Sequence, residues 1–202
     1  MKTAAIQTAA ILAWLTITAV ASPRYYVNTG ISKPMAPTAL KEQWRAGFNL
    51  GTGVGFTLSP RLEVIGGLSL HQMQLDDNAF LNTVTKANDV YASVNGGTTT
   101  LLGLAADFKY LVPTAQNRQV TPYLSAALGV ANKIVSQKEI TTEERIYSEA
   151  RESTIRALAG AGIGFEIAMA KNTSLAVEVG FRMMLTKEPT VVLPLNFGIV
   201  IN

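Results

Sequence analysis

The chain has 202 residues, a length sufficient for one folded domain. Of these residues, 48% are hydrophobic and 15% are charged. Its net charge of +3 is too small to indicate binding to nucleic acid or to anionic lipid. The sequence contains no cysteine, which excludes a disulfide framework and any chemistry that depends on a thiol.

The first 21 residues have the layout of a secretory signal peptide. Lys2 precedes a stretch from Ala4 to Val20 that is apolar apart from threonine and glutamine, and Ala19-Val20-Ala21 forms a small-x-small cleavage site. An uncleaved anchor is the alternative, but Pro23 would end a helix and favours cleavage before Ser22. We therefore expect 1–21 to be removed and 22–202 to form one domain. No later run of 18 apolar residues predicts a transmembrane helix.

Eight segments of the remaining sequence alternate between apolar residues and small or polar ones. A period of two predicts β-strands, because successive side chains point to opposite faces. The expected strands are 24–32, 43–58, 62–75, 98–112, 121–135, 153–168, 174–184 and 190–202. The connections mostly alternate between long and short, although 113–120 is intermediate and 185–189 is short. An even number of strands with this alternation is typical of outer-membrane barrels.

The charged residues of these strands all fall on the face opposite the apolar row. In the seventh strand, for example, Leu175, Val177 and Val179 share one face, and Glu178 and Arg182 lie on the other. A cationic side chain on the lipid face of a barrel costs about 2–4 kcal/mol at the bilayer midplane. We therefore predict an all-β fold, a single eight-stranded antiparallel up-and-down transmembrane β-barrel with the apolar rows facing lipid. A soluble lipocalin-like carrier, with those rows facing inward, is the structural alternative.

The assignment of the two strand faces predicts two sets of residues. The predicted lumen charge network consists of Arg45, Glu63, Asp107, Lys109, Arg156, Glu166, Glu178 and Arg182. The simplest interpretation is a structural one, in which internal salt bridges fill the barrel. The functional alternative is that these charges form a gate or a weak ion pathway. The predicted interfacial aromatic residues are Tyr25, Tyr26, Trp44, Phe56, Phe108, Tyr110 and Phe165.

The sequence resembles the small eight-stranded outer-membrane β-barrels of the OmpA/OmpX type. The resemblance covers 22–202 and includes the export signal, the strand count, the alternation of long and short connections, and segments 122–129 and 158–166. It implies a bacterial outer-membrane location, contact with outer-membrane lipids and insertion by the barrel-assembly machinery. One departure concerns the last residue, which in this family is usually aromatic. Here the chain ends in Asn202, with Phe197 as the nearest substitute.

Few residues suggest catalysis or metal binding. Ser69 and His71 share a face, and some eight-stranded barrels modify lipid A with serine and histidine, but this face is expected to point into the lumen rather than toward lipid. One histidine without cysteine provides no metal site, and no cofactor is expected.

Two long connections are expected to face outward. Connection 76–97 contains several small and polar residues. Segment 138–152 is either a solvated loop or an extension of the fifth and sixth strands beyond the membrane. An exposed strand edge of that kind can pair with a foreign strand.

Our main functional hypothesis is a non-enzymatic surface barrel with a structural or adhesion-like role and an extracellular protein or surface partner. A narrow porin-like channel for ions or small solutes is the second hypothesis, and a lipid A-modifying enzyme is the third.

Overall fold

The structure is a computed structural model that describes residues 22–84, 93–113, 119–141 and 146–202. The expected signal peptide, 1–21, lies outside these residues. Eight long strands account for most of the described chain. They are β1 (Arg24–Ala36), β2 (Gly47–Ser59), β3 (Leu62–Gln74), β5 (Thr98–Leu111), β6 (Val120–Val135), β9 (Glu152–Ala170), β10 (Thr173–Met184) and β11 (Thr190–Ile201).

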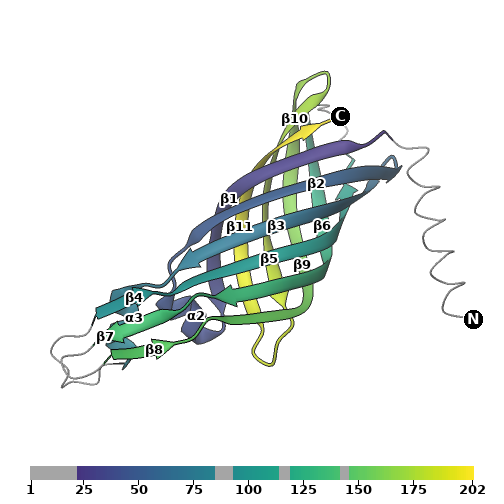
Figure 1. The fold of residues 1–202 in the computed structure, drawn as a ribbon. Coiled ribbons are helices and arrows are strands. Elements are labelled where there is room, and N and C mark those ends of the chain that lie inside the picture. The colour runs from purple at the N-terminus through teal and green to yellow at the C-terminus, as the bar shows by residue number, and fades with distance from the viewer. Residues whose placement is uncertain (1–21, 85–92, 114–118, 142–145) are drawn as a thin grey trace, which may run out of the picture.

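These strands close into one antiparallel barrel (Figure 1). Each strand pairs with the strands before and after it in the chain, and β1 closes the ring by pairing with β11 from Tyr25↔Ile201 to Ala36↔Val191. The predicted eight-stranded up-and-down β-barrel is confirmed. Its strands contain 12 to 19 residues, more than the 9–11 that cross a bilayer at the usual tilt.

The two faces of the wall have the predicted polarity. Val27, Leu104 and Leu128 on the outer face are 60%, 57% and 62% exposed, whereas the charged residues Glu63 and Lys109 on the inner face are buried. The apolar rows therefore cover the outer surface, and the lipocalin-like alternative is excluded.

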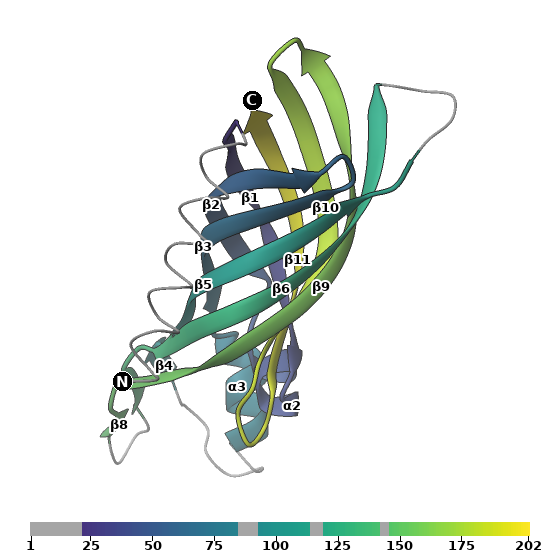
Figure 2. The ribbon, with the colours of Figure 1, turned by 90° about the vertical axis from the view of Figure 1, so that its right-hand side faces the viewer.

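Five shorter elements gather at one end of the barrel, opposite the end at which the C-terminus lies (Figures 1 and 2). They are α2 (Thr38–Gln43), α3 (Asp77–Val84) and a separate three-stranded sheet of β4 (Ser93–Gly96), β7 (Lys138–Thr141) and β8 (Ile146–Glu149). We call this the loop end and the opposite one the terminal end. Neither described helix is long and apolar enough to cross a membrane.

The three-stranded sheet continues the barrel wall. The β4–β7 pair Gly96↔Lys138 lies just beyond the last β5–β6 pair, Thr99↔Val135. Between them, the Ser136 hydroxyl accepts a 2.7 Å hydrogen bond from the Thr98 amide. The described parts of segment 138–152, which contain β7 and β8, therefore extend the strands beyond the barrel rim, as one of the two sequence interpretations predicts.

Candidate functional site

The barrel interior is filled by three layers, and the layer at the terminal end is made of charges. Arg24 donates hydrogen bonds of 2.9 Å to Glu63 and to Glu166, which brings together β1, β3 and β9. Glu166 also forms an ion pair with Lys109 of β5. Glu63 is 1% and Lys109 2% exposed, so these charges are removed from water and depend on each other.

Two tyrosine rings complete this charged layer. The Lys109 ammonium lies 4.0 Å from the ring centre of Tyr123 and 5.1 Å from that of Tyr26, within the range of cation–π attraction. The rings fit because glycines face them. A Cβ on Gly55 would lie 2.8 Å from the Tyr26 ring, and one on Gly164 would lie 2.5 Å from the Tyr123 ring. The Gly-rich inner face therefore leaves room for long side chains from other strands.

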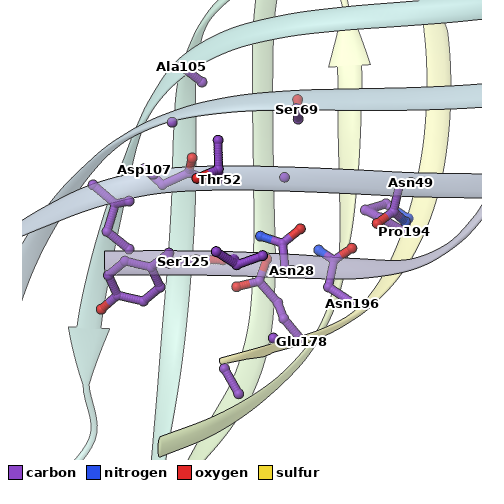
Figure 3. Close-up of a pocket in the computed structure, with 18 of the residues that line it drawn as sticks. Asn28, Asn49, Thr52, Ser69, Ala105, Asp107, Ser125, Glu178, Pro194 and Asn196 are labelled. Carbon is purple, nitrogen blue, oxygen red and sulfur yellow. The ribbon is translucent and has the colours of Figure 1, made fainter. Parts of the chain in front are cut away.

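The middle layer is a cavity of about 110 Å³ with polar walls. Arg182 of β10 donates a 2.6 Å hydrogen bond to Asp107 of β5, and the same nitrogen lies 3.9 Å from Glu178. Figure 3 shows Asn28, Asn196 and Glu178 grouped at this cavity, with Ser69 and Ser125 on other strands. The cavity thus combines charged groups with neutral amides and hydroxyls.

His71 lies toward the loop end of the same cavity and is buried. Its Nδ1 is 2.7 Å from the Ser32 hydroxyl, which also accepts a 3.1 Å hydrogen bond from the Asn49 amide. The imidazole therefore bonds a serine on β1 instead of forming the Ser69–His71 pair considered from the sequence. Ser69 lines the lumen, as the phase predicted.

The third layer, at the loop end, is apolar. One cluster contains Met73, Leu101 and Val192 with Trp44 packed against it, and a second contains Ala131, Leu158 and Met184. Met73 is 0% and Met184 1% exposed. Hydrophobic side chains therefore fill the lumen here, below the outer helices and sheet.

The structure brings together six of the eight residues of the predicted lumen network and leaves out two. Arg45 lies in the connection between α2 and β2, where it is exposed and binds Asp76 at 2.9 Å. Arg156 has the inward phase but lies beyond Met184, where β10 ends, and its guanidinium bonds the Ile155 carbonyl. Both residues lie closer to the loop end than the enclosed part of the lumen. Arg24 takes part in the network, although it was not predicted from the sequence. It lies four residues before Asn28, on the same inward face of the first strand, and this alternation could have indicated its position.

Two of the predicted interfacial aromatic residues point inward instead. Tyr26 is buried in the charged layer, because it neighbours the outward Tyr25 and must face the other way. Trp44 packs on the inner cluster because it follows α2 and precedes the first regular residue of β2, so the strand phase does not extend to it. Tyr25, Phe108, Tyr110 and Phe165 are exposed on the outer surface toward the terminal end, and Phe56 is partly exposed.

The sheet beyond the rim has its own supporting contacts. Lys138 of the central strand β7 is buried, with its ammonium 2.9 Å from Glu149 and 4.6 Å from the ring centre of Phe80 on α3. Gly96 and Gly97 have φ of +94° and +84°, which a residue with a side chain rarely adopts. These two glycines turn the chain between β4 and β5.

Within the described ranges, no group of three or more histidine, aspartate or glutamate side chains is arranged to hold a metal ion. No protein-family model and no curated protein sequence matches the chain.

Solved structures of other proteins share the fold. A major outer membrane protein from Thermus thermophilus superposes with a TM-score of 0.55 at 17% identity, over 89% of this chain and 99% of that one. Neisserial surface protein A superposes with a TM-score of 0.53 at 14% identity, over 88% and 96%. At these identities the likeness shows the fold alone, which is that of the small eight-stranded outer-membrane barrels.

Proposed function

We propose that the chain is an integral protein of the bacterial outer membrane with a structural or surface-interaction role. The apolar outer face of a closed barrel supports the membrane location, because a closed barrel leaves no open strand edge to face lipid. The terminal end, where the β2–β3 and β9–β10 turns are short, then faces the periplasm, and the loop end faces the cell exterior. Export by the signal peptide, insertion by the assembly machinery and contact with outer-membrane lipids belong to this proposal.

The observation that carries the surface role is the three-stranded sheet beyond the rim. Its central strand, β7, is paired on both sides, and β4 and β8 form its two edges in the described part of the chain. On β8, Ile146 is 69% exposed, a large aliphatic side chain at an open edge. Exposed edges bind extended segments of other proteins through backbone hydrogen bonds, with side chains adding specificity.

Replacing Ile146 by aspartate tests this role. Bacteria that display Ile146→Asp should attach less to surfaces coated with serum or matrix proteins than bacteria that display the wild-type chain. Leu185→Asp is the matched control, since Leu185 is 47% exposed and follows β10 at the same end but lies outside the sheet. Equal surface amounts are checked by protease accessibility. Equal attachment by both variants and wild type would refute a role for this edge.

A narrow channel is the second candidate, favoured by the polar cavity in the middle of the lumen. The charged layer below it and the apolar layer above it both fill the barrel with side chains, which supports a closed state. We therefore expect planar-bilayer recordings to show no discrete openings for the wild-type chain or for Glu178→Ala. Discrete openings in either would support the channel.

The proposed role is non-enzymatic. Ser32, His71 and Asn49 form a buried group inside the barrel, away from the outer face that an acyl chain would approach. We expect the mass-spectrometric profile of lipid A to be unchanged when the protein is expressed, and a new acylation or deacylation product would contradict this.

A further inference from the structure

The enclosed part of the lumen contains one more carboxylate than cations. Of the described residues that form its ion pairs, three are positive and four are negative. The cations are Arg24, Lys109 and Arg182, and the carboxylates are Glu63, Asp107, Glu166 and Glu178. A buried charge without a partner is strongly unfavourable, so the extra carboxylate must either take up a proton or be balanced by a further cation.

The pairing pattern assigns the extra charge to Glu178. Arg24 and Lys109 are both engaged by the carboxylates of the charged layer. Arg182 donates its short hydrogen bond to Asp107, and its distance of 3.9 Å from Glu178 is too long for a hydrogen bond. The Tyr123 hydroxyl also interacts with Glu178, but a phenol contributes no charge.

Neutral oxygen atoms without partners line the same cavity. Asn49 Oδ1 and Ser125 Oγ are buried and make no hydrogen bond, and their residues are 1% and 8% exposed. Ser125 and Glu178 are neighbours across Gly162, since a Cβ at that glycine would lie 2.8 Å from Ser125 Oγ and 3.1 Å from Glu178 Oε1. Buried acceptors of this kind normally bind water or an ion.

We propose that the cavity binds a monovalent cation, Na⁺ or K⁺. Glu178 supplies the neutralising charge, and the neighbouring Ser125 Oγ supplies a neutral oxygen atom, a ligand that hard cations prefer. A single positive charge balances the lumen, whereas Ca²⁺ would leave a surplus and commonly uses more carboxylates. The cavity of about 110 Å³ has room for the ion and a few waters, since one water requires roughly 10–15 Å³.

His71 is the competing source of positive charge, because it lines the same cavity. A protonated imidazole would neutralise the lumen without an ion. The test is therefore performed at mildly alkaline pH, where an ordinary imidazole is neutral.

The first experiment compares the thermal unfolding of the folded barrel in detergent micelles in KCl, NaCl and choline chloride at equal ionic strength. The unfolding midpoint of the wild type should be higher in KCl or NaCl than in choline chloride, because a ligand of the folded state stabilises it. Glu178→Gln should lose this difference. Glu188→Gln, with the same change of charge in the exposed β10–β11 connection, should retain it. A wild type insensitive to the cation, or a Glu178→Gln variant with an unchanged difference, overturns the proposal.

The second experiment does not depend on a variant. Crystals of the wild type soaked in Tl⁺ or Rb⁺ should show an anomalous scattering peak in the cavity beside Glu178 and Ser125. A cavity without such a peak contradicts the site.

Discussion

The two ends of the barrel interior are filled by opposite kinds of chemistry. The terminal end contains Arg24, Glu63, Lys109 and Glu166, which bind one another beneath two tyrosine rings. The loop end contains methionine and aliphatic side chains from β3, β5, β6, β9, β10 and β11. A charged layer stabilises the fold only as a complete set, because each member is buried. An apolar layer loses stability in proportion to the volume that is removed. Three experiments test this difference, and a fourth concerns an exposed ion pair outside both layers.

Removing one member of the charged layer should have the largest effect. Lys109→Met leaves Glu166 with one cation fewer, and breaking a buried pair costs about 3–5 kcal/mol. The free energy of unfolding, measured by denaturant titration in micelles, should fall by that order. The double variant Lys109→Met/Glu166→Gln should be more stable than the single one. A double variant that is less stable than the single one would contradict the interdependence of these charges.

Truncating the apolar layer should cost somewhat less. Met184→Ala removes a side chain that is 1% exposed, and such truncations cost about 2–5 kcal/mol. The same denaturant titration measures the change. Met169→Ala is the matched control, because Met169 is 68% exposed on the outside of β9 and should cost little in micelles. Similar losses at both positions would argue against an apolar core at the loop end.

Adding a methyl group beneath the Tyr123 ring should have a moderate effect. A Cβ on Gly164 would lie 2.5 Å from this ring and from the Val177 carbonyl oxygen, and overpacking of this kind costs about 1–3 kcal/mol. The thermal midpoint of Gly164→Ala should fall. Gly66→Ala is the control, since a Cβ there meets nothing within 4 Å. A Gly164→Ala variant as stable as Gly66→Ala would contradict the tight packing of the charged layer.

Breaking the exposed Arg45–Asp76 ion pair, which lies outside both layers, should change the stability of the fold least. The Arg45 guanidinium and the Ala79 amide hold the pKa of Asp76 below its ordinary value of 3.8. Because the Asp76 pKa is lower in the folded state, the ionised carboxylate stabilises the fold at any pH above the pKa of the unfolded chain. This contribution is lost as the pH falls through the pKa of the folded state. NMR titration should show a low Asp76 pKa that rises toward the ordinary value in Arg45→Gln. An unchanged Asp76 pKa in this variant would exclude the ion pair in solution.

Much of the wall could be predicted from the sequence because strand alternation is a local property. The phase of Leu175 to Arg182 is visible in neighbouring residues, and the predicted bounds of β3, 62–75, differ from the observed ones by one residue. The same rule placed Glu63, Lys109 and Glu166 on the inner face.

The remaining features depend on contacts between distant segments. The pairing of Val94 with Ile140 joins two connections, and neither segment indicates its partner. The short helices α2 and α3 lie within long connections and depend on packing more than on intrinsic propensity. Arg156 has the correct phase, but its exposure depends on where β10 ends, which its own strand does not reveal.

The uneven height of the wall has a consequence for what can reach this protein. On the β5–β6–β9 side the strands continue through Ser136 and Gln137 into β7, and these six residues add roughly 20 Å of chain at about 3.3 Å each. At a strand tilt of about 45° this corresponds to roughly 14 Å along the bilayer normal. The polar headgroup zone on each side of a bilayer is roughly 5–8 Å deep. In the proposed orientation, the upper edge of this wall therefore projects past the headgroups into solution, where a macromolecule can approach it from the side.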